Sequence, residues 1–538
     1  MHGPTTAGET CVVDDVPQQP LFQGMGNHHR KITTQSVKTQ QYFDQGLTWA
    51  YGFNHGEAIR SLVAAVSHDE EAAMPWWGIA YCEGPNYNLP ITPERSKAAW
   101  YALQNAVARK PQATAKEQAL IEALETRYAM PIPEDRSGLD RAYAEAMKTV
   151  WTAYPNDPDV GTLYAESLML LRPWKLYTSE GEPVEDTDTI VNTLETVLRI
   201  QPDHPGANHL YVHAMEPSNT PHKALPAAHA LDNLIPSSGH LLHMPSHIYV
   251  RTGHWDKAIV QNQKAIKADA NYLTISPVQT MQHIYMIHNS HMMAYAAMMC
   301  GREQEAMKAA RLMEDQATDE ILANFGPVLD RWMCSVYDVQ KRFGRWDAIL
   351  AEPAPPGALV VTTAIWRAHR AIAYAAKQDF PNAEKEYTAF RNAREAIPLE
   401  VLAAGDMDDR FLEVSDLFVR GEIALQKKNW DRAIELLTQA ADIEATLAYG
   451  EPPQWTQPVR HTLGAVLLAA GNYSDAEACY REDLRKWPNN GWSLYGLSRA
   501  LEGQGKTDAA TKIRKQYQTA WSGADEPIRT SCKCIPKT

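Results

Sequence analysis

Cysteine is scarce in this sequence. The 538 residues include seven cysteines, an odd number spread from Cys11 to Cys534. Small disulfide-stapled domains instead carry many closely spaced cysteines in even number. The pattern therefore excludes that class of protein. One close pair, Cys532 and Cys534, could form a thiolate pair in an exposed tail, and the sequence leaves open whether this pair joins a metal site.

Long apolar runs are missing as well. No stretch approaches the roughly 20 residues that a membrane-spanning helix needs. The first twenty residues lack the basic start and the long apolar segment of a secretory signal. We therefore expect no membrane partner and, by default, a cytoplasmic protein. Export through a signal removed beforehand stays open.

Positive charge is in deficit, with 51 Lys and Arg against 65 Asp and Glu. Recognition of nucleic-acid phosphates depends on clustered Lys and Arg, so a net charge of −14 predicts no nucleic-acid partner. Three catalytic or cofactor motifs are also absent: His-Glu-x-x-His, Gly-x-Ser-x-Gly and the glycine fingerprint of dinucleotide-binding folds.

Helical pattern dominates from about residue 41 onward. Ala, Leu, Glu and Gln are abundant, and strand-like alternation is absent. One turn recurs, in which a small or polar residue precedes an aromatic or charged one, followed by an acidic residue and Ala. The segments are 52–69, 252–269, 300–313, 343–349, 428–443 and 471–484. They resemble tetratricopeptide repeats, helix–turn–helix units of about 34 residues that stack on one another.

The predicted fold class is therefore all-α, a superhelical solenoid of tetratricopeptide-like repeats with an extended N-terminal arm. Five segments are expected along the chain. They are the arm (1–40), N-terminal repeats (41–200), His-rich repeats (201–350), C-terminal repeats (351–520) and a tail (521–538).

Histidine is concentrated in three successive predicted helices. Eleven of the 19 histidines fall between residues 209 and 291. Aligning the repeats on their turns places His209, His243 and His291 at one recurring inward position. Further histidines lie three or four residues away, on the same helical faces. They are His213 in the first helix, His240 and His247 in the second and His288 in the third.

A metal centre explains this pattern better than a polar peptide groove or simple packing. Histidines spaced by three or four residues can bind one ion at roughly 2.0–2.1 Å. Imidazoles packed together without an ion would leave buried nitrogens unpaired. The predicted metal ligands are His209, His213, His240, His243, His247 and His291, joined by His28 and His29 of the arm. The predicted catalytic groups, which could instead serve as ligands or orient them, are Glu216 and His288.

The metal follows from the ligand type. Imidazole suits copper, iron and zinc, and this many histidines exceeds what one zinc ion needs. We expect one or two ions, with copper the best fit, iron second and zinc third. Copper or iron predicts an oxidoreductase or oxygenase acting on a small molecule. Zinc predicts a hydrolase with Glu216 as general base. Without metal, the repeats would be a non-catalytic scaffold with a protein partner on the concave face.

Candidate substrate-binding residues occur in two rigid segments and beside the histidines. The segment Gly84–Asn88, which includes Tyr87, is expected to be a rigid turn with exposed polar groups, and Arg172-Pro173-Trp174 sets a guanidinium beside an aromatic side chain. The full predicted set is Tyr87, Arg172, Trp174, Tyr211, Tyr249, Arg251 and Asn289.

Several of these segments together resemble a little-studied family of bacterial tetratricopeptide-repeat proteins. The shared segments are Gly26–His29, Tyr51–His55, Gly84–Asn88, Arg172–Trp174 and the three His-rich helices. The resemblance implies the repeat fold and a metal site, and it implies no particular reaction. Family members often carry a third consecutive histidine where this chain has Arg30, which weakens the case for the arm as a ligand donor.

Overall fold

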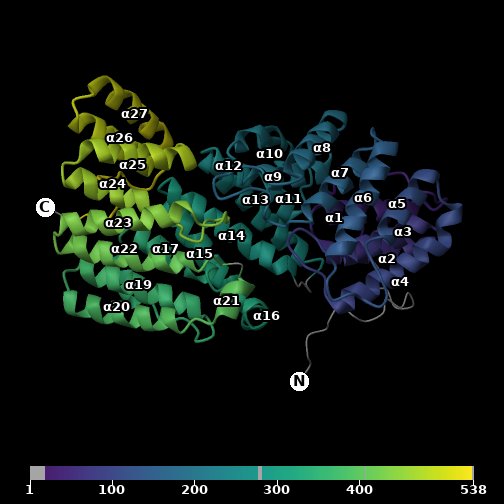
Figure 1. Cartoon of the computed structure of the whole chain (residues 1–538), viewed down its shortest axis with the longest axis horizontal. Coiled ribbons are helices and arrows are strands. Elements are labelled where there is room, and N and C mark those ends of the chain that lie inside the picture. Colours follow the sequence, from purple (N-terminus) through teal and green to yellow (C-terminus); the bar gives the residue numbers. More distant parts are fainter. Residues whose placement is uncertain (1–18, 277–280, 406, 536–538) are drawn as a thin grey trace. The chain divides into compact units, whose positions relative to one another are not determined.

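The computed structural model describes residues 19–276, 281–405 and 407–535, and these fold as an all-α solenoid of tetratricopeptide-like helix pairs (Figure 1). Within these residues β structure is limited to two isolated bridges, Asn86 with Leu89 and Tyr177 with Pro183. The predicted fold class is confirmed.

The chain divides into two compact units. Unit 1 comprises residues 1–248 and 267–277, and unit 2 comprises residues 249–266 and 278–538. The segment 201–350, predicted as one His-rich block, is therefore shared between the two units.

Unit 1 consists of helix pairs preceded by an irregular arm. Its helices are α1 (Val37–Tyr51), α2 (His55–His68), α3 (Ala73–Glu83), α4 (Pro93–Arg109), α5 (Ala115–Glu125), α6 (Ser137–Ala153), α7 (Pro158–Met169), α8 (Thr187–Ile200), α9 (Pro205–Met215), α10 (Leu225–Leu231), α11 (Gly239–His243) and the start of α12 (Pro245–Arg251). The described part of the arm, 19–36, has no helix. Helix α1 begins before the predicted boundary because Ser36 caps it, its hydroxyl accepting from the Thr39 N–H.

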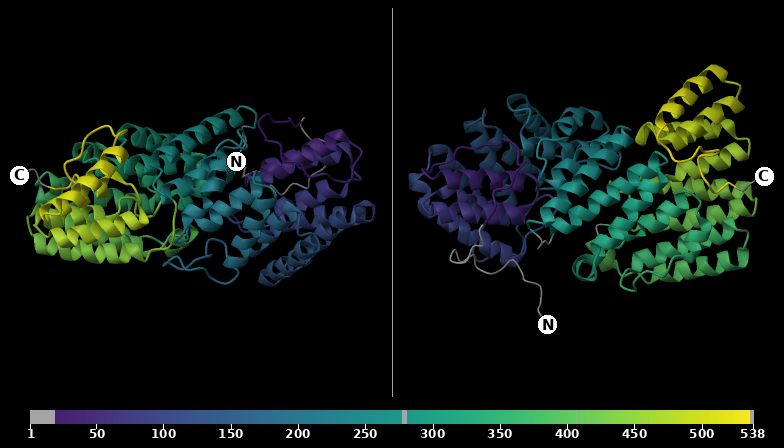
Figure 2. Two further views of the ribbon diagram at one scale, coloured as in Figure 1. Left: turned by 90° about the horizontal axis from the view of Figure 1, so that it is seen from above. Right: turned by 180° about the vertical axis from the view of Figure 1, so that it is seen from behind.

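Unit 2 continues the helix pairs, which stand out as stacked hairpins in the two views of Figure 2. Its helices are α14 (Met281–Met299), α15 (Glu303–Gln316), α16 (Asp319–Leu329), α17 (Ser335–Arg342), α18 (Trp346–Ala351), α19 (Val360–Ala376), α20 (Phe380–Glu395), α21 (Leu399–Ala404), α22 (Arg410–Gln426), α23 (Trp430–Ala445), α24 (Val459–Ala469), α25 (Tyr473–Lys486), α26 (Gly491–Gly503) and α27 (Thr507–Ala520). The helix α13 (Trp255–Leu273) has residues in both units.

The recurring turns have the conformation that their sequence predicts. Gly253, Gly301, Gly344 and Gly471 have φ between +68° and +81°, the left-handed region that favours glycine. Each of these glycines lies between the two helices of a pair. The turn pattern therefore marks the pairs correctly in unit 2.

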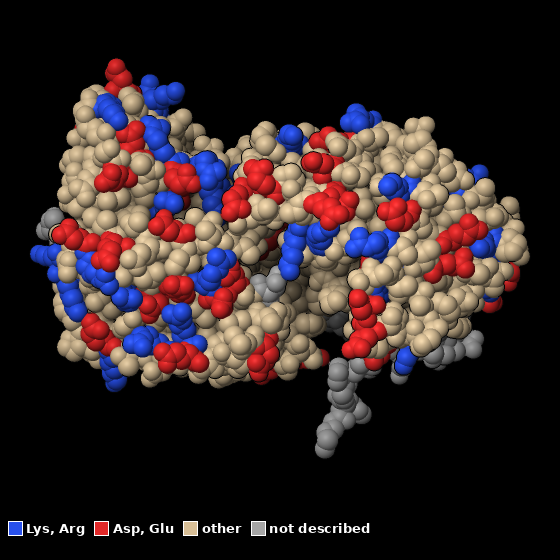
Figure 3. Space-filling view, in the orientation of Figure 1, with Lys and Arg blue, Asp and Glu red and all other residues tan. Residues whose placement is uncertain are grey.

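The core is apolar and the surface carries charges of both signs (Figure 3). Unit 2 has an extended core that includes the fully buried side chains of Phe390, Phe411 and Phe418. On the face shown in Figure 3, acidic and basic side chains are interspersed. Among the described residues, no helix has the length and apolar character needed to cross a bilayer.

Candidate metal centre

Two short buried helices of unit 1, α9 and α11, and the start of α12 carry the histidine cluster. Every residue of α9 is buried, and His204 caps its start by accepting from the Ala207 N–H at 3.0 Å. Helix α11 is also buried and is capped by Ser238. Because both helices lack a polar, solvent-facing side, the histidines they carry cannot be surface residues. His209, His213, His240, His243 and His247 are at most 2% exposed.

The imidazoles of α9, α11 and α12 meet through their Nε2 atoms. The Nε2 atoms of His209 and His240 lie 3.1 Å apart. Those of His243 and His247 lie 2.6 Å apart. His213 belongs to the same group, since it offers a ring nitrogen within 4.8 Å of nitrogens of His209 and His240. The five unit 1 histidines predicted as metal ligands on these helices therefore come together as two adjacent sets.

The opposite ring nitrogens are held by acceptors. The Nδ1–H of His209 donates to the carbonyl oxygen of Tyr51 at 2.6 Å. The Nδ1 atoms of His213 and His247 each lie 2.8 Å from a different oxygen of the fully buried Glu216. An acceptor at Nδ1 fixes the proton there and leaves the Nε2 lone pair available, the arrangement in which proteins orient histidine ligands. Glu216 thus contacts two histidines, one through each carboxylate oxygen.

Burial keeps these imidazoles neutral. Desolvation, followed by repulsion from His213, lowers the pKa of His209 well below its usual value. Desolvation, with repulsion from His209 and His243, does the same to the pKa of His240. The pKa of His213 is lowered by desolvation too, although the carboxylate of Glu216 raises it in part. The cluster is therefore built from unprotonated nitrogens.

Phe53 forms one wall of the cluster and was not predicted as a site residue. Its ring centroid lies 4.3 Å from that of His209 and 5.8 Å from those of His213 and His240. Its backbone has φ +56°, the left-handed conformation that costs a non-glycine residue roughly 1–2 kcal/mol. The ring contacts hold this phenylalanine at a turn position that Gly253 and Gly301 occupy in two other repeats. The segment Tyr51–His55 offered the only sequence signal for it.

Two of the predicted substrate residues line the other side of His213. The ring centroids of Tyr87 and Trp174 each lie 5.4 Å from that of His213, and they lie 5.0 Å from each other. The turns Gly84–Asn88 and Arg172–Trp174 thus deliver an aromatic pair to the cluster. The guanidinium of Arg172 instead pairs with Glu185 and Asp186. The hydroxyl of Tyr211 donates to Glu195 on α8 at 2.8 Å.

The arm histidines, His28 and His29, form hydrogen bonds with other residues than the five histidines on α9, α11 and α12 do. His28 Nε2 lies 3.0 Å from Asp159, a carboxylate that also contacts Tyr51, Arg30 and His204. Burial alone would raise the pKa of Asp159, but hydrogen bonds from His204 and His28 and the charge of Arg30 hold it well below its usual value. A guanidinium therefore already neutralises this carboxylate.

His29 is exposed and pairs with Asp44 at 2.7 Å. The contacts of His28 and His29 fasten the arm to α1 and α7. The His204–Asp159 contact was missed at the sequence level, because a lone histidine and a distant aspartate form no local motif.

The remaining predicted site residues lie in unit 2. His288 and His291, on α14, each have a ring centroid 5.3 Å from that of Trp332. Desolvation and the nearby Arg331 lower the pKa of His291 to about 3, and neither of its ring nitrogens has a hydrogen-bond partner among the described residues. Such a nitrogen suits a metal ligand, so the predicted ligand role of His291 stays a prediction.

Three further predicted residues have unit 2 surroundings. Asn289 is fully buried. Arg251 stacks over Trp487 at 5.6 Å, and Lys257 lies 5.3 Å from the ring of Tyr249. These contacts are typical of packing between helices, and the predicted substrate roles are left as predictions.

Comparison with known proteins yields fold neighbours only. No protein-family model and no curated protein matches the sequence. Among solved structures, the chain is similar to a human IFIT1 dimer with m7Gppp-AAAA, at 15% identity and a TM-score of 0.33, with 91% of each chain covered. A human IFIT1 dimer with PPP-AAAA matches at 15% identity and a TM-score of 0.31, with 90% of this chain and 91% of that chain covered. Likeness of this degree transfers no site and no activity.

The comparison does correct one prediction. The acidic composition predicted no nucleic-acid partner, and this exclusion does not hold for the fold, because IFIT1 structures of similar fold are solved with m7Gppp-AAAA or PPP-AAAA. The physical reason is that net charge describes a whole chain, whereas one groove of opposite charge is enough to bind phosphate.

Proposed function

We propose that the histidine cluster of unit 1 binds one or two transition-metal ions and that the protein is a metal-dependent oxidoreductase acting on a small molecule. The observation that carries the proposal is that the two nitrogens of an imidazole ring have different contacts. The Nδ1 atoms of His209, His213 and His247 face oxygen acceptors, while the Nε2 atoms of His209 and His247 face those of His240 and His243. Facing lone pairs repel unless a proton or a metal ion lies between them.

A metal ion fits this position, and the alternative that metal analysis tests is a neutral hydrogen bond from the Nε2–H tautomer of His240 to His209. Burial disfavours protonation of His209 and His240, as their lowered pKa values indicate. Two nitrogens bound to one ion at 2.0–2.1 Å lie about 2.9–3.4 Å apart for ligand angles between square and tetrahedral. The 3.1 Å separation of His209 and His240 falls in that range. The 2.6 Å separation of His243 and His247 needs a small ring rotation.

The ligand set favours copper or iron over zinc. His209, His213 and His240 would hold one ion, and His243 and His247 would supply nitrogens for the same ion or a second. A redox-active ion bound there would supply one-electron chemistry with dioxygen. A zinc hydrolase would need a carboxylate free to act as a base on metal-bound water. Both oxygens of Glu216 instead hold histidines, so we assign Glu216 an orienting role.

The chain's own residues provide the substrate surface and exclude water. Tyr87 and Trp174 form an aromatic wall beside His213, and Phe53 covers three imidazoles from another side. Aromatic rings next to a neutral nitrogen cluster favour a small, partly apolar substrate.

The test is metal content. Protein purified without a His tag should retain at least about one equivalent of copper or iron, and His213→Ala should lose it. His222→Ala, at an exposed position outside the cluster, should not. Equal metal content in the two variants would contradict the proposal.

A further inference from the structure

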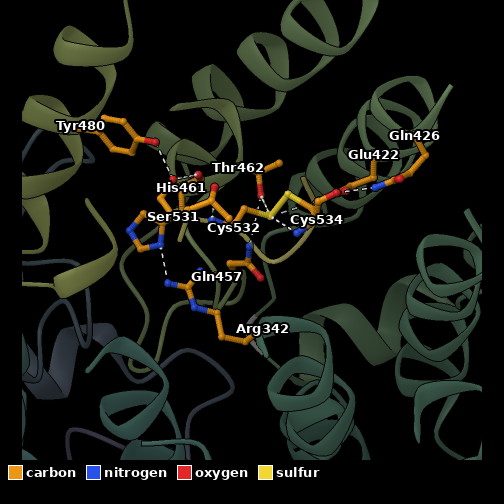
Figure 4. Close-up of a disulfide and its surroundings, with 11 residues drawn as sticks. Arg342, Glu422, Gln426, Gln457, His461, Thr462, Tyr480, Ser531, Cys532 and Cys534 are labelled. Carbon is orange, nitrogen blue, oxygen red and sulfur yellow. Dashed lines mark hydrogen bonds between the residues drawn. A yellow bond between two sulfur atoms is a disulfide. The ribbon is translucent and has the colours of Figure 1, made fainter. Parts of the chain in front are cut away.

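The C-terminal tail packs against helices of unit 2. After α27, the chain returns to α22, α24 and α25 (Figure 4). Ser531 donates to the carbonyl oxygen of His461 at 2.8 Å and lies 2.6 Å from the hydroxyl oxygen of Tyr480. The side chain of Gln426 donates to the carbonyl oxygen of Cys534 at 2.5 Å. Cys532 and Cys534 are 3% exposed, so the prediction of an exposed tail is wrong for this segment.

Two sulfur atoms and a carboxylate meet at this point. Cys532 and Cys534 form a disulfide, and Cys532 Sγ lies 4.0 Å from Oε1 of Glu422 on α22. The ligand atoms of the three residues all lie within 4.8 Å of one another. Glu422 is 2% exposed, and its second oxygen has no hydrogen-bond partner among the described residues. A buried carboxylate oxygen without a donor is costly unless a cation is nearby.

The surroundings of Cys532 suit a thiolate. Its Sγ receives hydrogen bonds from the Thr462 hydroxyl at 3.3 Å and from the Cys534 N–H at 3.1 Å. Two donors aimed at one sulfur stabilise negative charge on it. Both donors belong to segments that the tail contacts hold in place.

One buried cation, Lys341, lies close to this group. Its single positive charge does not balance the negative charge that two thiolates and Glu422 would carry. Lys341 on α17 is buried, with its Nζ 4.1 Å from the ring centroid of Phe418 and 4.5 Å from that of Trp455, and it interacts electrostatically with Glu422. Two thiolates and Glu422 would carry three negative charges, of which Lys341 offsets one. A divalent cation would leave the site neutral, whereas a monovalent one would leave a buried net charge.

We propose that Cys532, Cys534 and Glu422 form a zinc site of their own once the disulfide is reduced. A dithiol reductant would give two electrons and two protons to the Cys532–Cys534 bond and would itself become a disulfide. Zinc binding would then release the two thiol protons. Thiolate sulfur with one carboxylate is a donor set that zinc accepts, and three protein ligands leave a fourth tetrahedral position for solvent or a small ligand. The site lies in unit 2 and shares no residue with the histidine cluster.

Cobalt substitution tests this site separately from the histidine cluster. Full-length untagged protein is reduced with a dithiol, freed of metal, and titrated anaerobically with Co²⁺ and then Zn²⁺. Thiolate ligands give Co²⁺ an intense near-ultraviolet charge-transfer absorption that nitrogen and oxygen ligands do not give. The wild type should show this absorption and lose it when zinc displaces cobalt. The double variant Cys532→Ser/Cys534→Ser should lack it, and Cys479→Ser, which changes another buried cysteine, should retain it.

Two further measurements keep the proposal testable if the double variant fails to fold. Glu422→Gln leaves both thiols in place, and its zinc affinity should fall at least about tenfold. Thiol counting on denatured protein should change from five free thiols, seven cysteines less the bonded pair, to seven after native-state reduction. A count that stays at five, or wild-type protein without the charge-transfer absorption, would overturn the proposal.

Discussion

Glu216 holds the imidazole of His213 through a 2.8 Å contact between its Oε1 and the histidine Nδ1. Its other oxygen holds Nδ1 of His247 at the same distance. One buried carboxylate therefore sets the tautomer and the direction of two rings, from α9 and α12. This relationship makes Glu216 the residue through which ligand geometry can be altered without deleting a ligand.

Glu216→Gln should weaken metal binding about 10- to 100-fold, the usual effect of losing the partner that orients a histidine ligand. The amide nitrogen donates and cannot accept from an imidazole N–H, so one of the two histidines loses its fixed orientation. Competition with a chelator of known affinity measures the change. Glu180→Gln, at a fully exposed position, is the control. Unchanged affinity in Glu216→Gln would mean that the two histidines are not ligands.

Acid should destabilise the metal-free protein. The folded-state pKa values of His209, His213 and His240 are depressed by burial, and that of His291 is lowered to about 3. The unfolded chain binds these protons near pH 6.5 and the folded protein does not. The stability that the neutral rings contribute is therefore present above pH 6.5 and lost below it, at up to about 1.4 kcal/mol per pH unit for each histidine. Urea unfolding at pH 7 and pH 5 measures this, and equal free energies of unfolding would contradict it.

At Phe53, substitution by glycine should destabilise the protein less than substitution by alanine. Phe53→Ala should destabilise the protein by about 3–5 kcal/mol, because it removes a buried ring from beside three imidazoles. Phe53→Gly removes the same ring but relieves the left-handed backbone, at φ +56°. It should therefore be more stable than the alanine variant by about 1 kcal/mol. Thermal or urea unfolding of the two variants decides the order, and an alanine variant that is the more stable would show that the backbone is not strained.

The arm should detach when its central carboxylate is removed. Asp159→Asn leaves the buried Arg30 with Asp157 as its remaining ion-pair partner and weakens the contacts of His28 and His204. Because Asp157 still pairs with Arg30, the cost should be below the roughly 3–5 kcal/mol of an uncompensated buried charge. Limited proteolysis should then cut within residues 19–36. His29→Ala, at an exposed position, should leave the cleavage pattern of the wild type.

Some features of this structure could be predicted from the sequence. The turn glycines Gly253 and Gly301 mark helix pairs because only left-handed backbone fits there. The spacing of His209 and His213, and of His243 and His247, puts each pair on one helical face and brings them together in space. Local periodicity was enough for these features because each rests on residues within one or two helical turns.

Other features of the two sites could not be predicted, because they depend on contacts between residues that are far apart in the sequence. The acceptor for His209 is the backbone carbonyl of Tyr51, 158 residues away, and any residue type has a carbonyl. Phe53 occupies a left-handed turn where glycine is expected, so its role depends on tertiary contacts alone. The partner of Cys532 and Cys534, Glu422, lies on a helix more than one hundred residues earlier. Arg172 pairs with the neighbouring carboxylates of Glu185 and Asp186, and its predicted substrate role stays a prediction.

The most direct test of the metal centre is elemental analysis of untagged wild-type protein beside Cys532→Ser/Cys534→Ser and His213→Ala. Each is loaded anaerobically with copper or iron and desalted. The account predicts at least about one equivalent of copper or iron in the wild type and in the cysteine variant, and a loss of that metal in His213→Ala. Metal well below one equivalent in the wild type after loading with either ion would contradict it.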